Sequence, residues 1–594
     1  MSTLIFDLEC DNLYDKVTTI WGMGYRWTTW ENSYWTRDPD EIREILTSAE
    51  VLVGHNIIGY DLPVLKKLLN WEPAPHQVIK DTLVYSRLIY TDLGSKDKVA
   101  KKYHLEGKLR GSHSLAAWGI RMGLEKGEAP SFDVWDDSMV EYCIRDVDVT
   151  TKLFQHMEAQ GYSKEALDLE HAFADIIEEQ IRTGVAFNVK EAGALYLRLH
   201  QDKKELTDAL NARFAGWYKP DGVFTPKRDN RTRGYRAGME FTRIKWVPFN
   251  PGSNQHVAYV LKREYGWKPT QFTPCGDIKV SEEVLGSLKY PEAKLFYDYS
   301  VVNKLLGFLG DGDQSWLKNE VNGRLHGYVN PNGAVTGRCT HSKPNLANVP
   351  SSRAKWGKEC RALFTVSKPQ HWLLGFDASG LELRCLAGYL AHYDEGAYAH
   401  AVCEGNKEDG TDTHTVQAKI LGCDRDTEKT WFYGFIYGAQ DPKLGSILGG
   451  TRQQGKESRL RIQSKVPGLG KLVTKVHEAS DRGYLTGIDG RKIKVRSKHA
   501  SLNSLLQGCG AAIMKRFLVI LKARLTNAGY VSGTDYWIVL NIHDEIQVET
   551  KNKAMAEFIG HHCKQAIKEA GEYYDFKCPI DGEFSIGKNW SETH

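Results

Sequence analysis

The stretch WIVLNIHDEIQVE, residues 537–549, consists of an apolar run, a short polar connection and a second run that alternates apolar and polar residues. This pattern predicts two strands joined by a tight turn around His543, Asp544 and Glu545. Two carboxylates held at the end of an apolar sheet repel each other unless a cation lies between them. The stretch therefore predicts a cation site at the end of a strand pair.

A second strand that ends in an acid lies far upstream. Residues 373–377, LLGFD, are apolar up to Asp377, and ASGLE follows at 378–382. Two strand-borne acids that meet in space suit a pair of magnesium ions about 4 Å apart, the arrangement used for in-line phosphoryl transfer. We therefore expect Asp377 and Asp544 to share metal ions, and the reaction to be nucleotidyl transfer.

Length and composition set broader limits. A chain of 594 residues is long enough for several cores, and its net charge of +3 does not by itself indicate a nucleic-acid partner. No apolar stretch approaches the roughly 18 residues needed to cross a bilayer, and the N-terminus lacks a basic leader region, so we expect neither a membrane segment nor a signal peptide. Eleven cysteines without a C-x-x-C pair argue against zinc and against disulfides.

The character of the sequence changes along the chain. Residues up to about 160 alternate strand and helix patterns, and helical periodicity dominates from 164 to 214. Between Lys219 and Lys245, eight basic residues stand against three acidic ones, interrupted by Gly and Pro, which predicts a basic loop. This loop can be an ordinary solvated surface or a phosphate-binding segment. From residue 322 onward, strands mix with long helices.

The N-terminal region contains spaced acids. Asp7 and Glu9 lie two apart on an expected strand and share a face, while Tyr142 and Asp146 lie one helical turn apart. With Asp61 at a helix start, these groups could bind two metals and orient a water for phosphodiester hydrolysis. The residues alone leave a metal site and a set of surface acids equally open.

Residues 424–439 predict a helix with one broad functional stripe. Arg425, Lys429, Tyr433 and Tyr437 are spaced by four, which suits a triphosphate at one end and a base at the other. A half-buried amphipathic helix is the alternative. However, basic residues near a helix N-terminus are disfavoured by the macrodipole, and an anionic ligand would reverse that preference.

These motifs resemble two known sets. The order D-x-E, N-x-x-x-Y-D and Y-x-x-x-D resembles the three exonuclease motifs of DnaQ-like proofreading domains. The set R-x-x-x-K-x-x-x-Y-G is similar to the fingers helix of family A DNA polymerases, as are DASGLELR (377–384), TGRCTH (336–341), LNSLLQ (502–507) and HDE (543–545). The resemblance spans nearly the whole chain, and it is strongest to the replicative DNA polymerases of short-tailed phages.

The resemblance implies a fold class that is α/β and α+β multidomain. An RNase H-like 3'-5' exonuclease domain (1–162) would precede a right-hand polymerase. Its thumb would hold residues 163–320 with a short basic loop at 217–246, its palm 321–390 and 501–594, and its fingers 391–500. Phage relatives carry a long thumb insert that binds thioredoxin, and the interval from Trp217 to Trp246 is too short for it, so thioredoxin dependence is doubtful.

The resemblance also implies residue roles. Asp377 and Asp544, with the Ala378 carbonyl, match metal ligands for two Mg²⁺ ions, which Mn²⁺ can replace. Asp7, Glu9, Asp61 and Asp146 match exonuclease metal ligands, and Tyr142 matches the water-orienting tyrosine. His414, Arg425 and Lys429 match triphosphate contacts, Tyr433 and Tyr437 the nucleotide pocket, Glu382 the steric gate against ribose, and Arg338, Gln507 and His543 primer-template contacts. On charge, we expect Lys227, Arg228, Arg231 and Arg233 to hold duplex DNA.

The expected partners are primer-template DNA, dNTPs, a phage helicase-primase and a single-strand DNA-binding protein, in the cytoplasm of an infected bacterium. Two other interpretations remain. A single-subunit RNA polymerase shares the palm acids and the Lys-Tyr-Gly helix, although Glu382 and the N-terminal acids argue against it. A protein of a different class, a DNA-binding scaffold without catalytic activity, is the second. The presence of all six predicted metal-binding acids argues against it; they are Asp7, Glu9, Asp61, Asp146, Asp377 and Asp544.

Overall fold

The computed structural model describes residues 2–124, 127, 130–273 and 275–594. The chain forms two compact units. The first contains the chain up to Val185, His326–Ser342 and Val366–His594, and the second contains Ala186–Leu325 and Lys343–Thr365.

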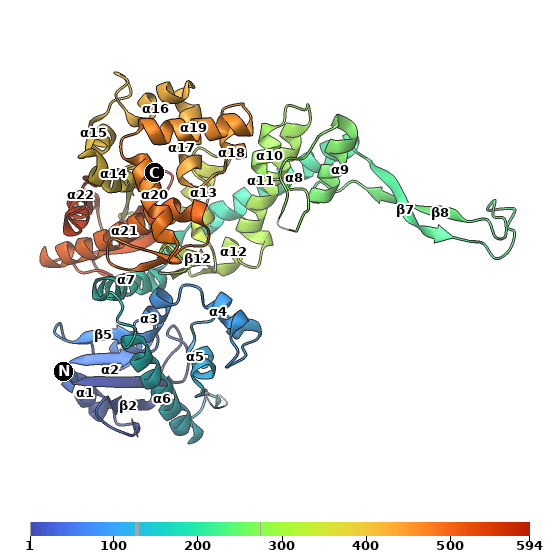
Figure 1. Cartoon of the computed structure of the whole chain (residues 1–594). Coiled ribbons are helices and arrows are strands. Elements are labelled where there is room, and N and C mark those ends of the chain that lie inside the picture. Colours follow the sequence, from blue (N-terminus) through green and yellow to red (C-terminus); the bar gives the residue numbers. More distant parts are fainter. Residues whose placement is uncertain (1, 125–126, 128–129, 274) are drawn as a thin grey trace. The chain divides into compact units, whose positions relative to one another are not determined.

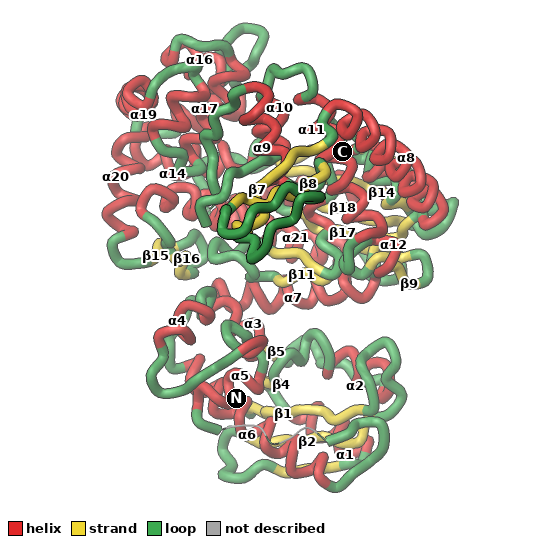
Figure 2. The backbone as a smooth tube through the Cα atoms, turned by 90° about the vertical axis from the view of Figure 1, so that its right-hand side faces the viewer, coloured by secondary structure: helices red, strands yellow, loops and turns green. Residues whose placement is uncertain are grey.

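The N-terminal part of the first unit is built on a sheet with the strand order β3-β2-β1-β4-β5 (Figures 1 and 2). Strand β1 (Thr3–Cys10) pairs antiparallel with β2 (Ile20–Trp27) and parallel with β4 (Val51–Gly54). Leu4 and Phe6 enter one core, whereas Ile5 enters another with residues of helix α6 (Ser138–Glu158). Since side chains alternate along a strand, Asp7 and Glu9 share the face of Ile5.

The remaining elements of this part connect and cover the sheet. They are β3 (Tyr34–Thr36), α1 (Pro39–Ser48), α2 (Asp61–Leu69), β5 (Val78–Asp81), α3 (Thr82–Ile89), α4 (Leu93–Val99) and α5 (Leu115–Met122). The alternation of strands and helices expected up to about residue 160 is confirmed.

A second sheet of the first unit has the order β17-β18-β14-β19. Strands β14, β17 and β18 of this sheet are labelled in Figure 2. Strand β14 (Trp372–Ala378) lies between β18 (Glu545–Thr550) and β19 (Gly582–Gly587), and β17 (Tyr536–Ile542) forms the predicted hairpin with β18. Helices α21 (Ser501–Asn527) and α22 (Lys553–Tyr573) contribute to the core on which this sheet packs. All strands but β14 come from the C-terminal 60 residues, so the sheet joins distant segments.

Helices separate β14 from its sheet partners along the chain. They are α14 (Leu381–Asp394), α15 (Ala397–Glu404), α16 (Thr413–Leu421), α17 (Arg425–Ile436), α18 (Asp441–Ile447), α19 (Arg452–Lys465) and α20 (Leu469–Ser480). The hairpin of β15 (Tyr484–Thr486) and β16 (Lys492–Lys494) follows, and its turn contains Gly490, whose φ is 79°. A further hairpin pairs β11 (Tyr328–Asn330) with β12 (Thr340–Ser342).

A buried charged network ties helix α7 (Lys164–Thr183) to these elements. The Glu170 carboxylate accepts hydrogen bonds from Lys515 Nζ on α21 at 2.7 and 2.9 Å, and Arg491 lies 2.7 Å away. Lys515 also donates to the Pro331 carbonyl at 2.9 Å and to the Asn332 side chain at 3.2 Å. Because buried charges are stable only when they are paired, this network fixes the position of the loop that begins at Pro331.

The second unit combines helices with a short sheet and a long hairpin. The sheet has the order β13-β6-β10-β9. Its strands are β6 (Val185–Phe187), β9 (Glu320–Val321), β10 (Arg324–Leu325) and β13 (Phe364–Thr365). The helices are α8 (Val189–Arg213), α9 (Asn254–Tyr265), α10 (Glu282–Ser287), α11 (Ala293–Leu306), α12 (Trp316–Asn319) and α13 (Gly357–Ala362).

The prediction that residues 217–246 form a basic loop needs correction, because two strands lie in this interval. About half of it is a two-stranded antiparallel hairpin of β7 (Gly216–Phe224) and β8 (Phe241–Pro248), and the connecting tip between the strands is irregular. A register shift between Pro220 and Val223 interrupts the alternation of side chains. That irregularity, together with the Gly and Pro residues, hid the strands in the sequence.

The expectation that no stretch is long and apolar enough to cross a bilayer is also wrong by length and composition. Among the described residues, one helical segment, Lys498–Asn527, passes both criteria with a hydropathy of 1.4. However, 78% of that window is buried inside the protein, where it forms part of the main core. Its apolar character is accounted for by internal packing.

Candidate functional site

The β17–β18 hairpin and β14 bring two acids to one edge of the sheet. Asp377 is in register with Glu545, and the Ala378 N–H donates to the Asp544 carbonyl at 3.0 Å. Asp377 and Asp544 are both exposed at this edge, whereas Ala378 is buried. Asp377 therefore lies on β14, and Asp544 lies in the turn just before the neighbouring strand β18.

Electrostatics at this edge favour a bound cation. Partial burial of its carboxyl group and, second, the charge of Asp544 raise the pKa of Asp377 to about 6. Burial likewise raises the pKa of Asp544. Adjacent carboxylate oxygens whose ionised forms are disfavoured are the donors that Mg²⁺ and Mn²⁺ prefer. The donor set thus fits divalent ions of this class.

The hairpin turn separates the roles of two consecutive acids. Glu545 is buried, and its carboxylate accepts from Gln547 Nε2 at 2.7 Å and from the Trp590 indole, with His594 Nδ1 at 3.0 Å. Asp544 is left facing outward from the turn. His543 has a φ of 58°, a backbone conformation that costs energy for a residue other than glycine and is frequent at functional sites.

Helix α17 carries the predicted phosphate-binding residues. Its first turn is capped by Asp424, which accepts from the N–H groups of Asp426 and Thr427. Arg425 donates to Asp412 at 2.8 and 3.1 Å, while Lys429 is exposed. The helix ends at Ile436, so Tyr437 lies at its C-cap rather than within the predicted helix.

His414 on α16 lies beside this helix. Its Nδ1 is 2.8 Å from the Glu428 carboxylate, and both residues are buried. Burial raises the pKa of Glu428, against the opposing effect of His414. The acidic partners of Arg425 and His414 were missed by the sequence analysis, because they depend on how α16 and α17 pack.

Glu382, at the start of α14, is held from two sides. Arg338 donates to one carboxylate oxygen at 2.9 Å, and the Tyr437 hydroxyl donates to the other. The Tyr433 ring lies 6.0 Å from that of Tyr437, and burial, followed by the charges of Glu382 and Asp544, raises the pKa of Tyr433. The structure therefore gathers the predicted steric gate, the nucleotide-pocket tyrosines and Arg338.

Two further predicted residues lie around this region. Burial and, second, the charge of Arg338 lower the pKa of His543. Gln507 is half-buried on α21. At the next residue, Gly508, an added Cβ would lie 3.5 Å from the Thr336 carbonyl, so α21 passes close to the loop that carries Arg338.

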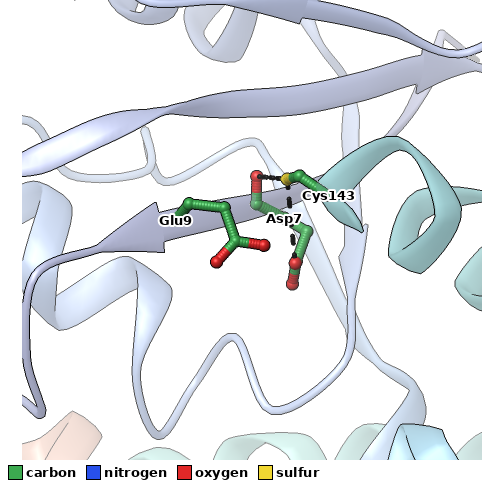
Figure 3. A group of neighbouring side chains, drawn as sticks. All are labelled: Asp7, Glu9 and Cys143. Carbon is green, nitrogen blue, oxygen red and sulfur yellow. Dashed lines mark hydrogen bonds between the residues drawn. The ribbon is translucent and has the colours of Figure 1, made fainter. Parts of the chain in front are cut away.

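The N-terminal acids form a separate cluster (Figure 3). Ligand atoms of Asp7, Glu9 and Cys143 all lie within 4.8 Å of one another. Asp61 lies beside strand β1, because its carboxylate accepts a hydrogen bond from the Leu8 N–H at 3.1 Å. Burial and then the charge of Asp7 raise the pKa of Asp61 well above its ordinary value.

Helix α6 places the remaining predicted groups at this cluster. Asp146 is buried, and its charge, with those of Asp7 and Glu9, helps burial to raise the pKa of Cys143. Tyr142 is half-buried, with its ring 5.9 Å from that of Phe132. The sequence analysis missed Cys143, although its place three residues before Asp146 on one helix face could have indicated it.

The predicted DNA-binding residues Lys227, Arg228, Arg231 and Arg233 are exposed at the tip of the β7–β8 hairpin, in the second unit.

Known proteins match this chain along its whole length. Residues 232–592 match the model of DNA polymerase family A. The DNA-directed DNA polymerase of Enterobacteria phage T3 is 34% identical over 713 aligned residues, covering 100% of both chains, and that of Escherichia phage T7 is 33% identical over 716 with the same coverage.

A solved structure has the same fold. The POL domain of Pol1 from M. smegmatis, in complex with DNA primer-template and dNTP, gives a TM-score of 0.75 at 17% identity, over 99% of this chain and 96% of that one. The expected fold class and family are thus confirmed. By its matched domain and its full-length phage relatives, the chain belongs to DNA polymerase family A.

Proposed function

We propose that the chain extends a DNA primer in the 5'-3' direction with dNTPs, and that its N-terminal part removes nucleotides in the 3'-5' direction. The observation that carries the polymerase assignment is the pair of exposed acids at one edge of the sheet, Asp377 on β14 and Asp544 in the adjoining β17–β18 turn. Membership of family A supports it.

Members of family A generally use divalent metal ions. Asp377, Asp544 and the Ala378 carbonyl would hold two Mg²⁺ ions, which Mn²⁺ can replace. When bound, such ions lower the pKa of the attacking hydroxyl and stabilise charge on the attacking and leaving oxygens. The raised pKa values of both acids support this role, because a cation removes the repulsion that ionisation creates.

The chain's own side chains would position the nucleotide. His414, Arg425 and Lys429 would bind the triphosphate, and Lys429 Nζ would donate a proton to the leaving pyrophosphate. To bind the triphosphate, Arg425 first has to give up its hydrogen bonds to Asp412. A triphosphate can compete for Arg425 because it carries more negative charge than one carboxylate. Lys429, being exposed, is available without such an exchange.

Selection of the correct substrate would follow from the groups around Glu382. This residue is anchored by Arg338 and Tyr437, so it would keep a fixed position and exclude a ribose 2'-hydroxyl. Tyr433 and Tyr437 would line the nascent base pair. Arg338, Gln507 and His543 would contact the primer-template end, where minor-groove acceptors are common to correct pairs.

The 3'-5' exonuclease assignment rests on the N-terminal cluster. Asp7, Glu9, Asp61 and Asp146 would hold metal ions, and Tyr142 would orient the attacking water. The proximity of Asp7 and Glu9, and the raised pKa of buried Asp61, support a cation site there.

The proposed domains divide the whole chain. Residues 1–162 would be the exonuclease, 163–320 the thumb, 321–390 and 501–594 the palm, and 391–500 the fingers.

One assay separates the two activities. A labelled primer annealed to a longer template should be degraded with Mg²⁺ alone and extended when dNTPs are added. Asp377→Asn should abolish only extension, and Asp7→Asn only degradation. Loss of both activities in either variant would contradict two separate sites. Ribonucleotides should be rejected by wild type and accepted by Glu382→Ala, and preference of wild type for ribonucleotides would favour an RNA polymerase.

The proposed setting is phage replication in the cytoplasm of an infected bacterium, with a helicase-primase and a single-strand DNA-binding protein as partners. The similarity to the T3 and T7 enzymes supports it. The short interval between Trp217 and Trp246 makes a thioredoxin-binding insert implausible. Extension of a long primed template should therefore be unchanged by added thioredoxin, and longer products with thioredoxin would contradict this.

A further inference from the structure

The β7–β8 hairpin has two chemically different faces. Lys219 lies directly opposite Lys245, and alternation along β8 places Arg243 on the same face. On the other face, Tyr218 lies opposite Trp246, with their rings 5.0 Å apart. The hairpin extends away from the helices of its own unit (Figure 1). One face therefore carries three cations, with Phe224 and Phe241 beyond Arg243 towards the tip, and the other face carries aromatic and aliphatic side chains.

The cations of this hairpin are not neutralised within the protein. Eight basic residues stand against three acidic ones between Lys219 and Lys245, an excess larger than the +3 of the whole chain, so the remainder of the chain is slightly acidic. Among the residues that the structure describes, none of the eight forms an ion pair. These residues are Lys219, Lys227, Arg228, Arg231, Arg233, Arg236, Arg243 and Lys245.

The pairing of two lysines across the strands is costly by itself. Like charges directly opposite each other destabilise a hairpin, and this hairpin has no third strand to share the cost. A polyanion lying along the basic face would offset the repulsion between the two lysines with attraction to its phosphates. Each phosphate contact also releases counterions, which adds to the binding free energy. The arrangement thus indicates an anionic partner.

Aromatic packing holds the base of the hairpin, and one backbone bridge continues the pairing into its tip. At its base, the Trp217 ring stacks on Tyr259 at 4.3 Å, and Phe214 and Phe249 lie in the core of the same unit. At its tip, Asn230 and Tyr235 form a β-bridge. Lys219, Arg243 and Lys245 therefore lie on a paired backbone that packs on the core of its own unit.

We propose that the basic face of the β7–β8 hairpin binds the phosphates of duplex DNA. The nine residues of β7 span about 26 Å at about 3.3 Å per step, comparable with one turn of B-DNA at about 34 Å. Lys219, Arg243 and Lys245 contact one stretch of the backbone, and the tip cations Lys227, Arg228, Arg231 and Arg233 extend the contact. The inference rests on the proposed function only in that DNA is the polyanion.

The test is equilibrium binding of a labelled blunt duplex by the full chain, in chelator and without nucleotides, over a range of KCl concentrations. The face variant combines Lys219→Gln, Arg243→Gln and Lys245→Gln. Since each phosphate contact contributes about 0.9 to the slope of log affinity against log salt, the slope should fall by about 2 to 3, with roughly hundredfold weaker binding near 0.1 M salt.

Two matched controls complete the experiment. Tyr218→Thr with Ile244→Thr changes the opposite face to residues that also favour strands, and should keep the wild-type slope. Lys553→Gln, Lys564→Gln and Lys568→Gln remove the same charge from α22, and should also keep it. If the face variant retains the slope and binds within about twofold of wild type, or if either control loses the slope equally, the proposal is overturned.

The outcome is separable from that of the proposed function. Asp377→Asn, which should not extend primers, should bind duplex with the wild-type salt slope. If wild type itself fails to extend primers, the proposed function fails while the slope measurement still decides the role of the hairpin. Binding of an acidic protein but not of DNA would overturn the DNA assignment.

Discussion

Replacing Asp377 by asparagine should stabilise the protein in chelator, and should remove much of the stabilisation that Mg²⁺ gives to wild type. Burial and the charge of Asp544 raise the pKa of Asp377 to about 6 from its ordinary 3.8. An acid whose folded-state pKa is raised costs stability wherever it is ionised in the folded protein. This cost is fully present above about pH 6 and disappears as the pH falls towards 4.

The size of the effect follows from the two pKa values. The difference between 3.8 and about 6 corresponds to about 3 kcal/mol if it is fully expressed. Asp377 is exposed at the sheet edge, so solvent screening reduces the expected gain to about 1 kcal/mol. Mg²⁺ should reverse the order, because an ion that binds only the folded state stabilises it and the variant lacks one of its ligands.

Urea unfolding followed by tryptophan fluorescence measures both effects, in chelator and with Mg²⁺, near pH 8 and near pH 4. Glu583→Gln is the matched control, since Glu583 is exposed and lies opposite Asp377 on β19 but is not a predicted ligand. This control should keep the full response to Mg²⁺. The reasoning is refuted if Asp377→Asn is less stable than wild type in chelator near pH 8, or if it gains as much from Mg²⁺.

Three other substitutions test separate parts of the molecule. Tyr433→Phe should turn weak discrimination against dideoxynucleotides into strong discrimination, because the hydroxyl can replace the missing 3'-hydroxyl; equal incorporation by both proteins in a primer-extension assay would exclude this role. Lys515→Met should lower the free energy of unfolding by about 3 kcal/mol, since it leaves Glu170 buried with less compensation, and a urea titration showing a loss below about 1 kcal/mol would contradict it. Cys143→Ser should make Mg²⁺-dependent primer degradation less sensitive to Cd²⁺, because the thiol sulfur lies among the acidic oxygens and soft ions prefer sulfur; identical inhibition curves would argue against the contact.

The sequence was sufficient where the signal is local. The strands that carry Asp7 and Asp377, and the hairpin whose turn holds Asp544, were predicted because apolar runs and alternation are read directly from neighbouring residues. The family resemblance supplied the roles of the site residues, and the structure brings Arg338, Glu382 and Tyr437 together, although their roles stay predictions.

The sequence was insufficient where a feature depends on packing between distant segments. The ion pair of Arg425 with Asp412 and the inward orientation of Glu545 towards Trp590 arise from tertiary contacts that no periodicity encodes. The hairpin at 216–248 was taken for a loop because a register shift breaks its alternation. The helical segment Lys498–Asn527 is another case in which packing decides. Its high hydropathy reflects burial in the core of the protein.

The order of strands in the second sheet has a consequence for how the protein is made. Strand β14 pairs on both sides with segments that a ribosome synthesises more than 160 residues later, whereas the N-terminal sheet has all its strands by Asp81. During translation the N-terminal sheet can form early, whereas β14 has no partner strand until β18 and β19 have been synthesised. A nascent chain halted before β19 therefore exposes an aggregation-prone strand, and chaperone demand should peak in the last part of synthesis.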